Sequence, residues 1–233
     1  MSLTSSSHIL TQHFDSSEFA FKKIDEEVTA LRGRIRALHS FRNTFAPIYR
    51  LPPEILTRIF SFISRTPVSP EPKHFYSQSP SHKWLVATRV SQRWRNVALG
   101  SPTLWAHISN SYPEYIIKEL LQRSKATPLS VRMYVGSSQD AHLIRTTLHR
   151  IRDLVIDVDS SVWNIFWSSR NSPAPLLESL KISISGHSYT PPVKFSDSVF
   201  AGTTPRLRCL EITGATVDLE SSIFKDLTVL ELK

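Results

Sequence analysis

Two histidines and three aspartates are the residues whose types and spacing come closest to a catalytic or metal-binding pattern. His142 and His149 lie seven residues apart in a segment with helical periodicity, so one helix face can present both. Asp153, Asp157 and Asp159 lie on or just after an expected strand, where two carboxylates could act as an acid–base pair. No further side chain with metal-ligand spacing accompanies the histidines. We therefore interpret the histidines as solvated helix positions and the aspartates as loop or cap residues.

Sequence patterns of covalent catalysis and nucleotide binding are absent. The chain has neither a G-x-S-x-G turn nor a G-x-x-x-x-G-K-S/T loop, and it holds only six glycines. Its one cysteine, Cys209, can form neither an internal disulfide nor a multi-cysteine zinc site, which indicates a reducing compartment, cytoplasmic or nuclear. We expect no enzymatic activity, no cofactor and no metal.

The positive charge of the chain is concentrated in one segment. The net charge is +8, and residues 28–112 hold twelve lysines and arginines but only Glu54 and Glu71 as acidic residues. A local excess of positive charge suits either an acidic protein partner or nucleic acid. The side chains that could follow phosphates or stack on a base are Arg32, Arg34, Arg36, Arg42, Arg50 and Trp94. Nucleic acid is the weaker hypothesis, because Arg32 and Arg36 lie on the polar side of an expected helix and Trp94 lies in an apolar stripe.

The length of 233 residues allows one large domain or two small ones. With 40% hydrophobic and 21% charged residues, the composition is that of a globular protein. No run of 18 apolar residues occurs, and the N-terminus lacks the basic and apolar regions of a secretion signal. A membrane partner is therefore not expected.

The N-terminal part of the sequence changes character near residue 21. Residues 1–20 are rich in serine, which predicts a flexible N-terminus. Apolar residues then recur at alternating intervals of three and four, at Phe21, Ile24, Val28, Leu31, Ile35 and Leu38. This spacing predicts a heptad helix over residues 21–46 with one narrow apolar seam, weakened by roughly 1 kcal/mol at Gly33. The preferred partner of the seam is the next domain of the same chain, and self-association is the alternative.

Two amphipathic segments follow, separated by a loop. Residues 50–63, RLPPEILTRIFSFI, combine a proline-led helix start with an apolar stripe. Residues 64–83 contain four prolines and no periodicity, which predicts an exposed loop. Residues 84–99 again show helical spacing and end before Gly100 and Pro102, which predicts a second helix.

The C-terminal half contains an internal repeat. Alternating apolar triplets start at Leu129, Leu154, Leu180, Leu210 and Leu230. Residues three positions before four of these starts are also apolar, namely Ile151, Leu177, Leu207 and Leu227. An LxxLxI unit at this spacing predicts short strands of an irregular leucine-rich-repeat solenoid. An ordinary α/β domain with alternating strands and helices is the alternative. The last triplet reaches Lys233 without a polar capping repeat, so we expect the repeats to be incomplete.

Residues 51–108 resemble an F-box, the adaptor-binding module of cullin-based ubiquitin ligases. The matching residues of the first helix are Leu51, Pro52, Glu54, Ile55, Leu56, Ile59 and Phe60. Those of the later segments are Val90, Ser91, Arg93, Trp94, Val97, Ala98, Pro102, Leu104 and Trp105. The order of a heptad helix, this block and irregular leucine-rich repeats is similar to fungal-type F-box-like proteins. The loop of residues 64–83 stands where the family has a compact turn and a small helix.

The resemblance implies an α+β fold with a defined domain order. The expected parts are a flexible N-terminus at 1–20, a heptad helix at 21–46, an F-box-like domain at 47–108 and leucine-rich repeats at 109–233. The residues that the resemblance assigns to adaptor binding are Leu51, Pro52, Ile55, Leu56, Ile59, Val90 and Trp94.

The same resemblance implies a function without catalysis. The chain would be a substrate-recognition subunit that binds a Skp-type adaptor, and through it a cullin, while its repeats bind a target protein. The alternative is an F-box-like scaffold that binds the adaptor without delivering a substrate.

Overall fold

The computed structural model describes residues 5–65, 82–163, 173–185, 193–195, 200 and 203–233. The chain divides into two compact units, residues 1–52 and 53–233, and each is described by itself. Most of the predicted proline-rich loop falls at residues 66–81, outside the described residues. In the described part of the chain, no helix is long and apolar enough to cross a membrane.

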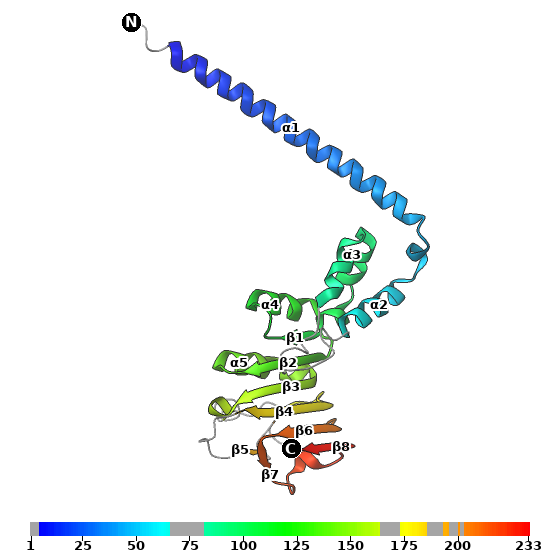
Figure 1. Ribbon diagram of the computed structural model, residues 1–233, viewed down its shortest axis with the longest axis vertical. Coiled ribbons are helices and arrows are strands. Elements are labelled where there is room, and N and C mark those ends of the chain that lie inside the picture. Colours follow the sequence, from blue (N-terminus) through cyan, green and yellow to red (C-terminus); the bar gives the residue numbers. More distant parts are fainter. Residues whose placement is uncertain (1–4, 66–81, 164–172, 186–192, 196–199, 201–202) are drawn as a thin grey trace. The chain divides into compact units, whose positions relative to one another are not determined.

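The first unit consists mainly of one long helix, α1 (Ser5–Thr44), followed by the short 3-10 helix η1 (Pro47–Arg50) (Figure 1). α1 begins inside the segment expected to be flexible, residues 1–20. Serine lowers helix stability only modestly, and neither glycine nor proline interrupts the chain before Gly33. The helix ends shortly before Pro47, because a residue that precedes proline disfavours the helical conformation.

The second unit begins with four helical segments, which together we call the helical module. These are α2 (Pro53–Arg65), η3 (His82–Arg89), α3 (Gln92–Leu99) and η4 (Pro102–Trp105). The single helix predicted over residues 84–99 is wrong, because the chain breaks before α3. Ser91 has an extended backbone there, and its hydroxyl accepts a hydrogen bond from the Trp94 N–H at 3.2 Å. Ser91 therefore acts as an N-cap that starts a new helix.

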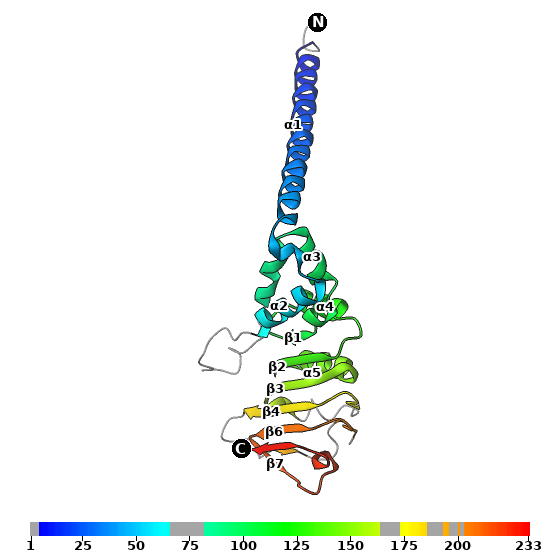
Figure 2. The ribbon, with the colours of Figure 1, turned by 90° about the vertical axis from the view of Figure 1, so that its right-hand side faces the viewer.

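A six-stranded parallel sheet forms the rest of the second unit, with the spatial order β1-β2-β3-β4-β6-β8 (Figures 1 and 2). Its strands are β1 (His107–Ser109), β2 (Leu129–Val135), β3 (Ile151–Asp159), β4 (Ser179–Ser185), β6 (Cys209–Thr213) and β8 (Val229–Leu232). β5 (Val193–Phe195) and β7 (Ala215–Val217) form a separate parallel pair. The connecting helices are α4 (Glu114–Arg123), α5 (Ser138–Thr147), η5 (Leu148–Arg150) and η7 (Ser222–Phe224).

The repeated leucines lie level with one another in this sheet. Leu154 of β3 pairs with Leu180 of β4, Leu180 with Leu210 of β6, and Leu210 with Leu230 of β8. Leu129 is shifted and pairs with Ile151, next to a register irregularity in β2. The fold thus has mixed helix and strand content, with a parallel sheet that does not close on itself.

The two faces of the sheet differ in burial. Side chains that alternate along β2, β3, β4 and β6 on one face are buried, and α5 contacts β2 there with its own buried Ala141 and Ile144. The opposite side chains of the same strands are only partly buried. Among the described residues, no helix covers this second face, which we call the open face.

Candidate functional site

The helical module has a small core of its own. Leu56 and Phe60 of α2 are fully buried, and the Phe60 ring lies 5.4 Å from the ring of Trp94 on α3, centroid to centroid. The buried Trp105 donates an indole hydrogen bond to the carbonyl of Ala98 at 3.0 Å, which ties η4 to the end of α3. The ring contact links α2 to α3, and the indole hydrogen bond links α3 to the next segment, η4.

Other apolar side chains of the module remain in solvent. Those with more than a third of their surface exposed are Ile55, Phe62, Leu85, Val86 and Val90. Ile55 and Phe62 lie seven residues apart, on one side of α2. We call these five side chains the module surface. Apolar side chains left exposed on a small helical module are candidates for contact with a protein partner.

The residues predicted to bind an adaptor have different environments. Ile55 and Val90 belong to the module surface, with 39% and 55% of their areas exposed. Ile59 and Trp94 are partly buried. Leu56 is 0% exposed, so in this structure it belongs to the core of the module and offers no area to a partner.

Leu51 and Pro52, the remaining predicted residues, lie in the first unit. Leu51 is partly buried and Pro52 is exposed. Sequence reasoning assigned no adaptor contact to Phe62, Leu85 or Val86 of the module surface, and Phe62 and Leu85 lie outside the apolar stripes expected to be functional. The sequence held one signal for these residues, because an apolar residue on the polar side of an amphipathic helix is expected to be exposed.

The charges around the module surface are mostly positive. Among the described side chains of the module, the basic ones are Arg58, Arg89, Arg93 and Arg95, and the acidic one is Glu54. This excess suits a partner of negative charge, which would associate faster and more selectively than a neutral one. Trp94 contacts Phe60, so the packing of its ring favours a structural role over base stacking.

The open face presents polar side chains in rows across the strands. One row runs Arg132, Val155, Lys181, Glu211 and Glu231, on β2, β3, β4, β6 and β8 in turn. The next row runs Tyr134, Asp157, Ser183 and Thr213. Because the register is uniform over these strands, residues distant in sequence become immediate neighbours on one surface.

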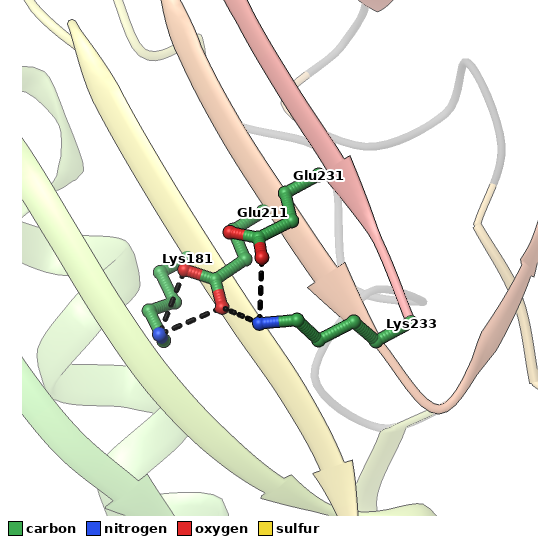
Figure 3. A network of polar contacts seen from close by, with 4 residues as sticks. All are labelled: Lys181, Glu211, Glu231 and Lys233. Atoms are coloured by element: carbon green, nitrogen blue, oxygen red, sulfur yellow. Dashed lines mark hydrogen bonds and ion pairs between the residues drawn. The ribbon is translucent and has the colours of Figure 1, made fainter.

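An ionic network orders one end of this face (Figure 3). The Lys181 ammonium lies 2.7 Å from the Glu211 carboxylate, and the Lys233 ammonium lies 2.7 Å from Glu231 and 3.4 Å from Glu211. The hydrogen bond from Lys181 lowers the pKa of the Glu211 carboxyl, and the hydrogen bond to Glu231 raises the pKa of Lys233. The network links side chains of β4, β6 and β8 with Lys233, the residue that follows β8.

The other end of the open face, on β2 and β3, carries Arg132 together with carboxylates that lie near Tyr134. Burial raises the pKa of the Tyr134 hydroxyl, and the negative charges of Asp159, Asp157 and Asp140 raise it further. Asp157 accepts a hydrogen bond from the Ser185 hydroxyl at 3.0 Å, and Asp159 accepts one from the Ser161 N–H at 2.9 Å. Asp159 thus has the capping role expected from the sequence.

The two histidines noted in the sequence are exposed on α5 and η5. Within the described residues, no group of three histidine, cysteine or carboxylate side chains is close enough together to hold a metal ion. Cys209 is free and partly buried on the open face.

Comparison with known protein families identifies an F-box-like domain at residues 48–111, which spans the module surface. No curated protein sequence and no solved structure matches the chain. F-box domains generally bind Skp-type adaptors. The chain therefore contains a protein-interaction domain of the F-box-like kind.

Proposed function

We propose that this chain is the substrate-recognition subunit of an SCF-type cullin-RING ubiquitin ligase. The observation that carries the proposal is the F-box-like domain at residues 48–111, whose helical module leaves an apolar patch in solvent. A module of this size cannot bury all of its apolar area alone, since small domains bury a limited fraction of their surface. A Skp-type adaptor would cover the remainder and connect the chain to a cullin.

The module surface defines the contact in more detail than the sequence pattern does. Ile55 and Val90 offer exposed apolar area, and Ile59 and Trp94 support them from partly buried positions. Leu51 and Pro52, which the resemblance also assigns to adaptor binding, belong to the first unit. Leu56 is left out, because it is buried within the module.

The sheet supports the second half of the proposal, a leucine-rich-repeat region that binds the target protein. Its parallel strands place their leucines at the same level, as stacked repeats require. The side chains of the open face do not pack in the buried face, so their identity can suit a particular target without changing the core. The chain itself would catalyse nothing. It would raise the effective concentration of a target near the ubiquitin-transferring subunits, in the cytoplasm or nucleus.

Adaptor binding can be tested with Ile55→Asp. Ile55 is partly exposed, so the substitution should leave the fold intact while it places a charge in the proposed contact. Loss of the apolar contact, about 2–3 kcal/mol, corresponds to roughly a hundredfold weaker binding of a purified Skp-type adaptor. Isothermal titration calorimetry measures this change.

The matched control is Leu219→Asp, which places the same charge at an exposed leucine outside the F-box-like domain. This variant should bind the adaptor like the wild type. Equal affinity of Ile55→Asp and wild type, with unchanged circular dichroism, would refute the module surface as the adaptor site.

Target binding can be tested on the open face with Val155→Asp. Val155 lies on β3, between Arg132 and Lys181 in one of the polar rows. Proteins retained by the wild-type chain in complex with adaptor and cullin should be lost from the variant in quantitative mass spectrometry, while adaptor and cullin remain. An unchanged set of retained proteins would contradict target binding by the open face and favour the alternative, a scaffold that binds the adaptor without delivering a substrate.

A further inference from the structure

Helix α1 carries a row of apolar side chains that the structure leaves uncovered. The seam consists of Phe21, Ile24, Val28, Leu31, Ile35 and Leu38. Five of the six are exposed, from 46% for Leu31 to 68% for Leu38, and Val28 is partly exposed. No residue between 17 and 44 is buried. A seam of this length is a surface that needs a partner.

The charges beside the seam divide α1 into two halves of opposite sign. In the first half, Glu18 and Asp25 flank the seam on one side and Glu27 on the other. In the second half, Arg32 and His39 continue the first side and Arg34 the second. Lys22 and Lys23 point away from the seam, because they occupy the outer positions of the heptad. The surface that flanks the seam is thus acidic before residue 28 and basic after residue 31.

We infer that α1 binds α1 of a second copy of this chain as an antiparallel two-stranded coiled coil centred between residues 29 and 30. In this register Val28 lies level with Leu31 of the second copy, Ile24 with Ile35, and Phe21 with Leu38. Every seam residue therefore meets an apolar partner, and each contact occurs twice because the interface is symmetric.

The flanking charges select the antiparallel arrangement over the parallel one. In the antiparallel dimer Asp25 faces Arg32, Glu27 faces Arg34, and Glu18 faces His39 of the second copy. In the parallel dimer only Glu27 and Arg32 attract each other among these residues, and Arg34 faces no acidic residue. The antiparallel dimer thus forms two kinds of ion pair where the parallel dimer forms one, and such complementary flanking charges determine orientation.

Arg42 and Gly33 are consistent with the same register. Arg42 occupies the next seam position after Leu38, so a parallel dimer would place it against its own copy, whereas the antiparallel dimer places it level with Ser17. Gly33 occupies the outermost heptad position, where an added Cβ would meet nothing within 4 Å. The weakest helix former of the segment therefore lies away from the interface.

Cysteine cross-linking of the full chain tests the orientation. Phe21→Cys and Leu38→Cys are prepared separately, each with Cys209→Ser. We expect a covalent dimer when the two variants are mixed under oxidising conditions, and none with either variant alone, because residues 21 and 38 meet only across antiparallel helices. Cross-linking of each variant with itself would establish a parallel dimer and overturn the inference.

Charge reversal gives an independent test by analytical ultracentrifugation. Glu27→Arg should raise the dimer dissociation constant about tenfold, since it places two arginines together at two symmetric sites. Glu27→Arg combined with Arg34→Glu should restore the wild-type value, because the pair is only exchanged. In a parallel dimer the double variant would stay weak, because the arginine introduced by Glu27→Arg would face Arg32 of the second copy.

A monomer at tens of micromolar concentration would also overturn the inference and point to residues 53–233 as the partner of the seam. Neither test requires the adaptor, so failure here is separate from failure of the proposed function. A dimer would place two F-box-like domains in one assembly.

Discussion

The two units of the chain differ in how far they bury the apolar side chains of their helices. α1 and α2 are both helices with an apolar stripe, yet α2 buries Leu56 and Phe60 within its own unit, whereas α1 buries no side chain between residues 17 and 44. The difference comes from their neighbours, because α2 packs against η3 and α3. Amphipathic periodicity therefore establishes that a helix needs a partner, but not whether the partner belongs to the same unit.

The largest change in stability is expected when a buried ring is removed from α2. Phe60→Ala should lower the free energy of unfolding of the second unit by about 3–5 kcal/mol, because it deletes a fully buried side chain in contact with Trp94. Urea unfolding followed by tryptophan fluorescence measures the change.

Phe62→Ala is the matched control on the same helix, since Phe62 is 68% exposed. Its effect should be below about 0.5 kcal/mol. Equal losses for the two variants would mean that the core of the module is not built on Phe60.

A smaller effect is expected in α1. Gly33→Ala should raise the helix content and stability of α1 by up to about 1 kcal/mol, because alanine loses less backbone freedom than glycine and the added Cβ meets open space. Amide hydrogen exchange of residues 25–40 should become slower, while exchange in residues 151–159 should stay unchanged. A change in both regions would show that the two units are energetically coupled.

The smallest effect concerns a surface contribution to the second unit. Lys181 lowers the pKa of Glu211 in the folded protein, so the ion pair stabilises the fold above the usual carboxyl pKa of 4.5 and loses this contribution as the pH falls through the lowered value. Glu211→Gln should cost about 0.5 kcal/mol at pH 7. Urea titrations of the two proteins should converge once the pH lies below the lowered pKa of Glu211, and a difference that persists there would not come from the carboxylate charge.

Much of the sheet was predictable from spacing, whereas the break in the module was not. The triplets at Leu180, Leu210 and Leu230 begin one residue after the starts of β4, β6 and β8, and the triplet at Leu154 lies inside β3, because alternating burial on a sheet face leaves a period of two in the sequence. The sequence did not predict β1, because three residues are too few to show that period. At the break before α3, the Ser91 hydroxyl caps the new helix, and a capping bond of this kind competes with a continuous helix.

In the candidate site, the sequence did not separate exposed apolar residues from buried ones. Ile55 and Leu56 are neighbours in sequence with similar hydrophobicity, yet one is 39% exposed and the other fully buried. Their position on α2 relative to η3 and α3 decides this, and a helical pattern alone does not contain that information. The leucine-rich-repeat interpretation and the adaptor contacts stay predictions.

The strand order of the sheet has a consequence for how the chain folds during its synthesis. In the six-stranded sheet, each strand from β2 onward pairs with a strand that has already left the ribosome, since the spatial order follows the chain. At about 5–20 residues per second, the next repeat of some 20–30 residues would emerge within a few seconds, so the growing edge of the sheet stays unpaired only briefly. A folding defect in β2 would deprive all later strands of their template. The same defect in β8 would leave the preceding five strands assembled.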